Sequence, residues 1–266
     1  MTRIVCVPLA PDVGRFEQNC VLIEDGIATA VSAGADIAVL PELATSGYVF
    51  ESGDEARGVA LHADADILTR WALMAGDTTV VVGFAEVGGD GSLHNSVAIL
   101  DGGEVRRVYR KVHLWNTEKR FFIAGSLAPP VLDTRHGRIG VMICYDLEFP
   151  ELTRKTVLAG ADVLLAPVNW PLVQRPVGER PPEQVIAMAT ARINRVFVAC
   201  CDRSGAERGQ EWTEGTVIVG HEGWPLAGGR GSELVIADVD LREARDKRLA
   251  GLADALGDRR PDVYAT

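Results

Sequence analysis

The chain lacks the long apolar runs that mark membrane proteins. No stretch of about 18 apolar residues occurs among its 266 residues, and the opening segment MTRIVCVPLA is too short and too soon polar for a secretory signal. Positive charge is also scarce, with 27 Lys and Arg against 37 Asp and Glu and a formal net charge of −10. Because nucleic acids and anionic lipids repel an acidic chain, we expect neither nucleic acid nor membrane as a partner.

Cysteine and histidine number five each, and neither type forms a metal-ligand pattern. No CxxC pair occurs, and no cluster of His and Cys has the spacing of a zinc site. An odd number of cysteines without a disulfide framework fits a reducing compartment. We therefore expect a soluble, cytoplasmic protein without a bound metal.

The rest of the composition is that of an ordinary globular protein, 47% hydrophobic and 24% charged. Apolar runs of strand length alternate with helical spacing and with hairpin turns along the whole chain. This alternation predicts an α/β layered fold with mixed sheets. No repeat or linker interrupts it, so we predict one domain over residues 1–266, in which residues from about 241 form a C-terminal helix or arm.

The most informative stretch is 139–151, IGVMICYDLEFPE. Its apolar run predicts a buried strand that ends at Cys144 and is followed by a segment able to begin a helix. A helix N-terminus at this turn would favour the thiolate of Cys144, and the backbone N–H of Tyr145 would point toward a forming oxyanion. A lone cysteine after an apolar strand is ordinarily a buried structural residue, so its role depends on residues elsewhere.

Three more ionisable residues occupy turn-like positions after predicted strands. Glu42 follows the apolar strand DIAVL, Lys111 leaves the strand-like run ending in VYR, and Glu118 follows a candidate helix cap. Taken singly, Glu42 and Lys111 are ordinary solvated charges, and Glu118 is an ordinary helix-start carboxylate.

Together these segments resemble the nitrilase superfamily of carbon–nitrogen hydrolases over nearly all of the chain. PELATSGY resembles the glutamate motif of that family, YRKVHLW its lysine motif, ICYDLEFPE its cysteine motif and TEKRFF the segment of its second glutamate. The resemblance implies that Cys144 is the nucleophile, Glu42 the general base, Lys111 the oxyanion-stabilising cation and Glu118 a supporting carboxylate. It also implies a four-layer α-β-β-α sandwich, no cofactor, and a homodimer or larger homo-oligomer.

The implied reaction is hydrolysis of the carbon–nitrogen bond of a linear amide through a cysteine thioester, which splits one difficult step into two easier ones. Glu42 would accept the thiol proton, pass it to the leaving nitrogen and later activate water. Lys111 and the Tyr145 N–H would stabilise the tetrahedral oxyanion. Glu42 needs a pKa near the working pH for these roles, and burial beside Glu118 would supply it.

Residues next to the cysteine narrow the substrate. Cys144-Tyr145-Asp146 resembles the amidase branches rather than the Cys-Trp-Glu of true nitrilases, so an amide is favoured over a nitrile. Leu147-Glu148 stand where branches that bind a substrate carboxylate often carry Arg, and a Glu would repel that carboxylate. We expect a small amide that is neutral or bears an amine attracted by Glu148, although Glu148 could equally cap a helix or form a salt bridge.

Four further residues are candidates to line the substrate pocket: Tyr48, Trp115, Asn169 and Trp170. Each could instead belong to the core, which is the ordinary place for an aromatic side chain. Among the histidines, His113 is predicted to lie nearest to the site, because it comes two residues after Lys111.

Other functions remain open at this point. Within the superfamily, the chain could hydrolyse N-carbamoyl (ureido) compounds or nitriles, or transfer the acyl group to an amine. Outside enzymology, it could be a pseudoenzyme that serves as a scaffold. The presence of Glu42, Lys111, Glu118 and Cys144 together argues against the scaffold.

Overall fold

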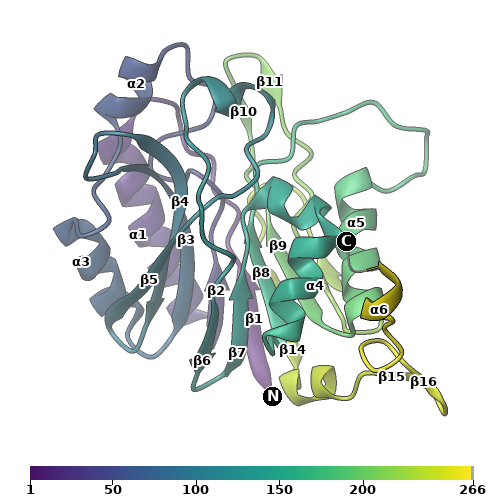
Figure 1. Cartoon of the computed structure of the whole chain (residues 1–266). Coiled ribbons are helices and arrows are strands. Elements are labelled where there is room, and N and C mark those ends of the chain that lie inside the picture. The colour runs from purple at the N-terminus through teal and green to yellow at the C-terminus, as the bar shows by residue number, and fades with distance from the viewer. Residues whose placement is uncertain (265–266) are drawn as a thin grey trace.

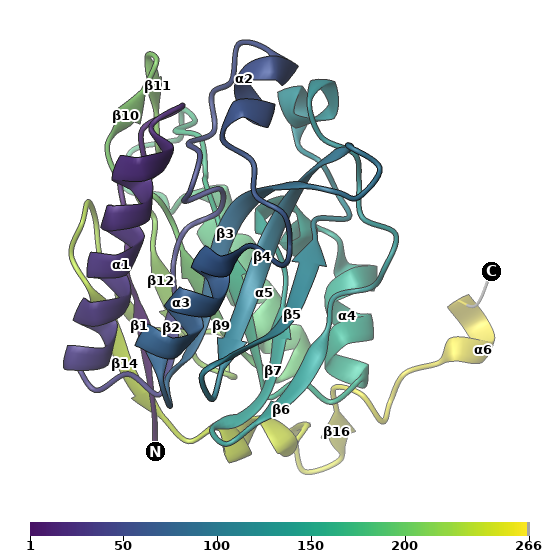
Figure 2. The same ribbon diagram turned by 90° about the vertical axis from the view of Figure 1, so that its left-hand side faces the viewer.

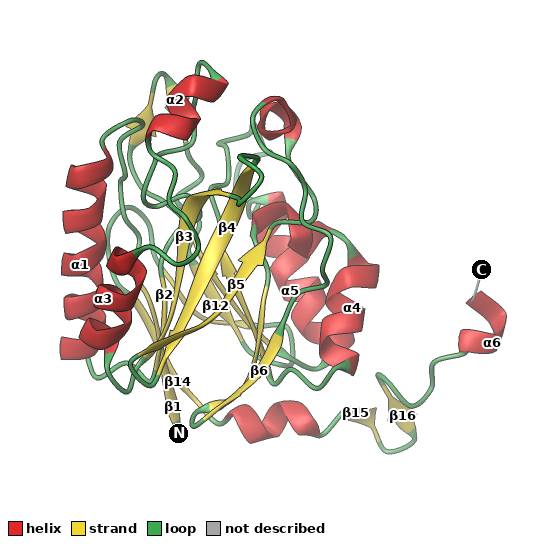
Figure 3. Ribbon diagram, turned by 60° about the vertical axis from the view of Figure 1, so that its left-hand side comes forward, coloured by secondary structure: helices red, strands yellow, loops and turns green. Residues whose placement is uncertain are grey.

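Two six-stranded β-sheets pack face to face at the centre of the molecule, and helices cover both outer faces (Figure 1, Figure 3). This computed structural model describes residues 1–264. Helices α1 (Phe16–Ser32) and α3 (Asp66–Ala75) lie outside one sheet, and α4 (Pro150–Leu158) and α5 (Pro182–Asn194) lie outside the other. This is the four-layer α-β-β-α sandwich that the resemblance implied.

The two sheets have matching strand arrangements. The first has the order β14 (Val235–Val239), β1 (Thr2–Cys6), β2 (Ile37–Val39), β3 (Thr79–Val87), β4 (Leu93–Asp101) and β5 (Glu104–Arg110). The second has the order β13 (Pro225–Gly228), β12 (Val217–Val219), β9 (Phe197–Cys201), β8 (Val163–Pro167), β7 (Gly137–Val141) and β6 (Val131–Thr134). In the first sheet β1, β2 and β3 run parallel, and in the second β7, β8 and β9 do so, while the outer strands of both are antiparallel.

The main core lies between the sheets. Val39 and Val97 of the first sheet belong to the same buried cluster as Val141 and Leu165 of the second. A second cluster joins the other face of the first sheet to α1 and α3. Burial of each large aliphatic side chain stabilises the fold by about 1.5–3 kcal/mol. Strands that are buried on both faces therefore consist of continuous apolar runs, and these runs are the pattern that predicted the strands.

The strand ends bring the predicted reactive residues to one edge of the sandwich. Glu42 follows β2, Cys144 follows β7 and Asn169 follows β8, three strands within the parallel parts of the sheets. Lys111 follows β5, which is antiparallel to β4 and therefore runs in the direction of β3. Functional groups gather where parallel strands end, because their carboxyl ends share an edge.

Gly83 on β3 allows the turn that carries Glu42 to cross this strand. A Cβ atom on Gly83 would lie 2.5 Å from the Leu43 nitrogen, 2.6 Å from the Pro41 oxygen and 2.7 Å from the Glu42 Cα. Because all three neighbours are backbone atoms, no side-chain rotation could relieve the overlap. Glycine at this position therefore lets the Glu42 backbone pack directly against β3.

Several short elements differ from the sequence-based expectation. No regular helix begins at Cys144: residues Cys144–Glu148 form a 3-10 helix, η2, and α4 starts only at Pro150, because a proline fits the first turn of a helix but not its interior. The sequence also did not predict α2 (Gly53–Gly58), the 3-10 helix η1 (Asn116–Arg120), or the hairpin of β10 (Ala206–Glu207) and β11 (Gln210–Glu211).

The segment from Leu241 contains no long helix. It comprises the 3-10 helix η3 (Leu241–Arg245), the hairpin of β15 (Arg248–Ala250) and β16 (Ala253–Asp254), and the single turn α6 (Pro261–Tyr264). Arg245 ties η3 to the body through Asp162, 2.9 Å away, whereas α6 stands clear of the sandwich (Figure 2). Among residues 1–264, no helix combines the length and apolar character needed to cross a membrane.

Candidate active site

A cavity of about 760 Å³ opens at the edge where these strands end, and Cys144 lies in its wall. The thiol residue is only 7% exposed. Tyr48, Trp115, Asn169 and Trp170, the four residues predicted to line a pocket, all border this cavity. The structure thus brings together residues that are about 120 positions apart in the chain.

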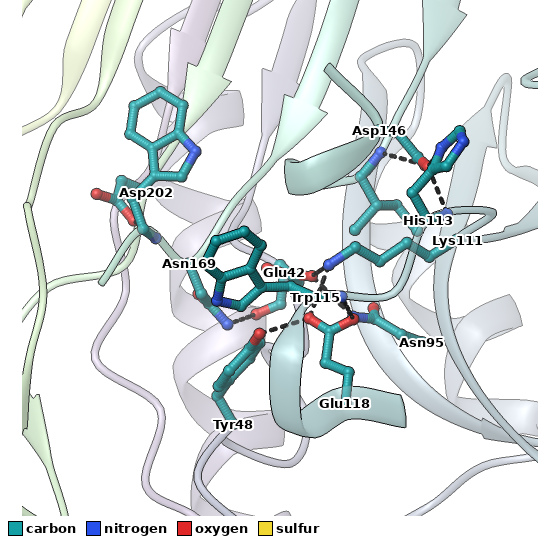
Figure 4. A network of polar contacts seen from close by, with 12 residues as sticks. Glu42, Tyr48, Asn95, Lys111, His113, Trp115, Glu118, Asp146, Asn169 and Asp202 are labelled. Carbon is teal, nitrogen blue, oxygen red and sulfur yellow. Dashed lines mark hydrogen bonds and ion pairs between the residues drawn. The ribbon is translucent and has the colours of Figure 1, made fainter. Parts of the chain in front are cut away.

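Beneath the cavity lies a buried cluster of one ammonium and two carboxyl groups (Figure 4). Lys111 Nζ donates hydrogen bonds to Glu42 Oε1 and to Glu118 Oε1, each at 2.7 Å. All three residues are at most 3% exposed. The three residues of the predicted glutamate and lysine motifs therefore meet, although they come from the end of β2, the end of β5 and the helix η1.

The cluster shifts the acidity of its members. Burial raises the pKa of Glu42 to about 7, against the opposing charge of Lys111 and with a further increase from Glu118. Burial by itself lowers the pKa of Lys111, but the two carboxylates outweigh it and the net pKa is raised. Lys111 therefore stays an ammonium, while Glu42 can gain and lose a proton near neutral pH.

Cys144 has a strained backbone, with a φ of +46° in the left-handed region. Such a conformation costs a residue with a side chain on the order of 1 kcal/mol, and surrounding bonds must hold it. Asp146 supplies them: its carboxylate accepts from the Tyr109 hydroxyl at 2.8 Å, the His113 N–H at 2.9 Å and the Ile143 N–H at 3.2 Å.

The surroundings of Cys144 favour the thiol whose proton Glu42 is expected to accept, and not the thiolate that a helix N-terminus would favour. Burial and the nearby Glu42 carboxylate raise the pKa of the thiol well above its ordinary value, and Lys111 and the Asn169 N–H offset only part of this. A 3-10 helix of five residues replaces the regular helix whose N-terminus was expected to stabilise the anion. The sulfur is therefore a thiol that needs a base, and the Glu42 carboxylate is close enough to perturb it.

Two side chains position the carboxylates of the cluster. Asn95 Nδ2 donates to Glu42 Oε1 at 2.7 Å, and the Tyr48 hydroxyl donates to Glu118 Oε1 at 2.5 Å. Glu118 Oε2 also accepts the backbone N–H of Trp115, at 3.1 Å. Tyr48 thus borders the cavity and holds Glu118 at the same time. Glu42 Oε2, by contrast, has no hydrogen-bond partner among residues 1–264 and is available to accept a proton.

The other predicted pocket residues are held by the second sheet. Asn169 Nδ2 donates to the backbone oxygen of Glu42 at 2.9 Å, and the Trp170 N–H donates to Asp202 at 2.9 Å (Figure 4). Trp115, by contrast, packs edge-on against Tyr145, with ring centroids 4.8 Å apart.

Glu148 also borders the cavity, and no ion pair or side-chain hydrogen bond to it occurs in the described part of the chain. His113, the histidine predicted nearest to the site, does not line the cavity. Its N–H and Nδ1 bond to Asp146, and its ring stacks on Phe149 with centroids 3.5 Å apart.

Sequence reasoning missed Asn95, Asp146, Glu183 and Trp212 as parts of the site. Asn95 had one usable signal, since it belongs to a polar trio, HNS, that opens an otherwise apolar strand buried along its whole length. A polar residue buried in such a strand needs a partner. The other three carry no local signal, because only the tertiary arrangement turns them toward the cavity or the cysteine loop.

Groups of three or more His, Cys, Asp or Glu that could hold a metal ion do not occur within residues 1–264. The cation of the buried cluster is the Lys111 ammonium, which is paired with Glu42 and Glu118. The arrangement can supply a nucleophile, a base and a cation to an acyl carbon at one point.

The chain belongs to the carbon–nitrogen hydrolase family, whose sequence model matches residues 4–249. A nitrilase of Pyrococcus abyssi is 34% identical over 99% of both chains, and an (R)-stereoselective amidase of Pseudomonas sp. is 32% identical over 97% of this chain and 91% of its own. Among solved structures, a variant of the amidase from Nesterenkonia sp. AN1 has a TM-score of 0.81 at 26% identity, covering 99% of this chain and 95% of that one. It carries the acetamide moiety of fluoroacetamide added covalently at its active-site cysteine. The resemblance to the nitrilase superfamily and the sandwich fold that it implied are confirmed.

Proposed function

We propose that the protein is an amidohydrolase that cleaves the carbon–nitrogen bond of a small linear amide through a thioester on Cys144 and releases ammonia or an amine. The observation that carries this proposal is the buried Glu42–Lys111–Glu118 cluster directly beneath a cavity whose wall contains a thiol. Burying one ammonium and two carboxyl groups costs stability. A scaffold would gain no function from the cluster that offsets this cost.

In the first half of the reaction, Sγ of Cys144 attacks the carbonyl carbon of the amide while the thiol proton passes to Glu42 Oε2, the oxygen without a partner. Lys111 and the backbone N–H of Tyr145 stabilise the oxyanion, with about 3 kcal/mol per donor. Glu42 then gives its proton to the leaving nitrogen, the carbon–nitrogen bond breaks, and ammonia or an amine departs from the thioester.

In the second half, water replaces the departed amine. Glu42 takes one proton from the water while the water oxygen attacks the thioester carbon. The carbon–sulfur bond then breaks, and Glu42 returns this proton to the sulfur of Cys144. Glu118 and Tyr48 keep Lys111 in place through both halves. A pKa of about 7 suits Glu42 to act as base and acid in alternation near neutral pH.

A nitrile is the second candidate substrate, because the relative from Pyrococcus abyssi is named a nitrilase. The same thiol could attack a nitrile carbon, and the Lys111 ammonium would stabilise the negative charge that develops on the nitrile nitrogen. The Tyr145-Asp146 pair after the nucleophile favours the amide, as in the amidase branches that the sequence resembles. N-carbamoyl compounds would use the same chemistry at a ureido carbon.

The proposal predicts ammonia release from small amides. A panel of propionamide, butyramide, the matching nitriles and an N-carbamoyl amino acid is incubated with the protein, and ammonia is measured. After rapid acid quenching, mass spectrometry should show the acyl mass on the intact protein and, after proteolysis, on the peptide that contains Cys144. Absence of both ammonia and the acyl mass with every compound would support the scaffold instead.

The activity should depend on pH through the Glu42 cluster. Because the ionised carboxylate is the form that accepts the thiol proton, kcat/KM is expected to fall about tenfold per pH unit below the apparent pKa, which lies at about 7, and to level off above it. This apparent pKa belongs to the coupled cluster. A rate that instead keeps rising to about pH 9 or beyond would mean that a preformed thiolate attacks, and Glu42 would then not be the base.

Cytoplasmic location and assembly into a homo-oligomer belong to the same proposal. All five cysteines are buried and free, which suits a reducing compartment. The outer helices of the second sheet carry exposed apolar side chains, with Leu158, Val185 and Ile193 between 46% and 51% exposed. A second copy packed on these helices would cover the exposed apolar side chains. Light scattering, which measures the molar mass in solution, tests for this assembly.

A further inference from the structure

We infer that the substrate carries an ammonium group on its acyl portion and that Glu148 and Glu183 bind this ammonium inside the cavity. The inference rests on the proposed amide hydrolysis and assigns to it a substrate class and two specificity residues.

The two carboxylates lie on neighbouring elements, one of which also carries the nucleophile. Glu148 ends η2, the 3-10 helix that begins with Cys144, and Glu183 lies in the first turn of α5. The two helices pack against each other. Both glutamates border the cavity into which Cys144 opens, so an acyl group attached to the sulfur would have them within its surroundings.

Neither carboxylate has a side-chain partner in the described part of the chain. No ion pair or side-chain hydrogen bond to Glu148 or Glu183 is formed within residues 1–264, and Glu183 Oε2 is a buried oxygen without any partner. Burial raises the pKa of Glu148, and the charge of Glu183 raises it further against a weaker opposing effect of Lys111. Glu148 is exposed and Glu183 half-buried at the cavity, and two carboxylates that repel each other there are stabilised by a cation that arrives between them.

Asn169 supplies an independent acceptor in the same cavity. It is 1% exposed, and its Oδ1 has no hydrogen-bond partner among the described residues. The amide orientation is set because Nδ2 donates to the backbone oxygen of Glu42, as Figure 4 shows. Asn169 and Cys144 border the same cavity, and the Asn169 backbone N–H lowers the pKa of the thiol, so the two residues are neighbours. A buried, unpaired acceptor next to the nucleophile calls for an N–H from the substrate.

The charges around the cavity favour a cation. Among the described residues that border it, three are carboxylates, Glu51, Glu148 and Glu183, and Arg120 is the one basic side chain. Arg120 is exposed, as is Glu148. Arg208 lies 3.9 Å from Glu51, and Arg175 opposes the rise in the pKa of Glu183. Lys111 offsets the rise in the pKa of Glu148 only in part, because Glu42 and Glu118 already bind its ammonium. A substrate carboxylate would meet repulsion where an ammonium, with three donors to share, would be bound.

A simpler role exists for Glu183 alone, since a carboxylate in the first turn of a helix interacts favourably with the helix dipole. It does not account for Glu148, which lies at the end of its 3-10 helix. The two roles predict different consequences when the charges are removed, because a dipole partner affects stability and an ammonium site affects the choice of substrate.

The test uses pairs of amides of equal size that differ by one charge. 3-Aminopropanamide and butyramide differ only in an ammonium in place of a methyl group. Two further pairs, glycinamide with propionamide and 4-aminobutanamide with pentanamide, vary the distance of the ammonium from the carbonyl. We expect kcat/KM to favour the ammonium member of at least one pair by about 10- to 100-fold, the range of a charge-assisted hydrogen bond. The E148Q/E183Q double variant should lose most of this preference, mainly through a higher KM for the ammonium member.

Glu151→Gln is the matched control, because Glu151 is also a first-turn glutamate but lies outside the cavity. It should leave the preference unchanged. Thermal unfolding of all variants separates loss of the ammonium site from loss of the fold. Calorimetric titration of 3-aminopropanamide into Cys144→Ala, with and without E148Q/E183Q, gives a binding readout that needs no turnover.

The outcomes for the two proposals differ. Equal or faster hydrolysis of the neutral member in every pair, or a preference that survives in E148Q/E183Q, would overturn the ammonium site and leave amide hydrolysis standing. If no member of any pair releases ammonia or acylates Cys144, amide hydrolysis and the ammonium site fail together.

Discussion

Cys144→Ala is expected to lower amide hydrolysis by about 10⁴-fold or more, because removal of a covalent nucleophile leaves only binding and electrostatic effects. The fold should remain, since alanine keeps the Cβ that Cys144 already places at a φ of +46° and removes one sulfur from a residue that borders a cavity. Ammonia release and thermal unfolding are measured on the same sample. Mass spectrometry should show no acyl adduct.

The control is Cys20→Ala. Cys20 is buried in α1, on the far side of the first sheet, and it belongs to a different core cluster. Its replacement should keep full acylation, with a modest loss of stability from the cavity that the sulfur leaves. Acylation that persists in Cys144→Ala and disappears in Cys20→Ala would contradict the assignment of the nucleophile.

Lys111→Met is expected to have the largest effect on stability. The substitution keeps the length of the side chain but leaves Glu42 and Glu118 buried without their cation, and breaking a buried ion pair in this way costs about 3–5 kcal/mol. For a chain of this size that corresponds to a decrease in Tm of roughly 10 °C. Activity should fall as well, by about 10²- to 10³-fold, with the loss of one oxyanion donor. Denaturant unfolding and steady-state kinetics measure the two effects.

The stability defect of Lys111→Met should depend on pH. Without the ammonium, the buried carboxylates hold their protons more tightly in the folded chain than in the unfolded chain, so the unfolded chain ionises first as pH rises. Stability of the variant therefore falls with rising pH relative to the native protein, and the defect should be larger at about pH 8 than at about pH 5.

Two further variants test the cause. Lys111→Met combined with Glu118→Gln removes one of the stranded charges and should recover part of the lost stability without recovering activity. Arg138→Met breaks an exposed pair with Asp133, whose side chains are 53% and 84% exposed, and should cost less than about 1 kcal/mol. A loss of stability that small in Lys111→Met itself would mean that the buried cluster does not stabilise the fold as an ion pair.

The comparison of sequence and structure separates what is local from what is not. Apolar runs such as DIAVL and DVLLAP predicted their strands to within a residue or two at each end, because a strand buried on both faces needs an uninterrupted apolar segment. The short elements escaped prediction. Neither η1 nor η2 has a periodic pattern long enough to recognise, and both owe their shape to the side chains that they position.

The candidate nucleophile, base and cation could be named from motifs, each of which is a continuous stretch of the chain. Their partners could not be named in that way. The hydrogen bond from Asn95 to Glu42 joins residues 53 positions apart, and the one from Asn169 to the Glu42 backbone joins residues 127 apart. Such pairs depend on the register of the sheets, which no local pattern specifies.

By itself, then, the sequence determined the layered α/β architecture, because apolar spacing and turn chemistry act over a few neighbouring residues. Its motifs identified the candidate reactive residues through their resemblance to the nitrilase superfamily. Only the tertiary structure showed that its surroundings raise the pKa of the Cys144 thiol well above its ordinary value and that Glu148 and Glu183 border the same cavity. Both outcomes depend on burial and on charges brought close by distant segments, and the free energy of an ionised group is set by those surroundings rather than by its neighbours along the chain.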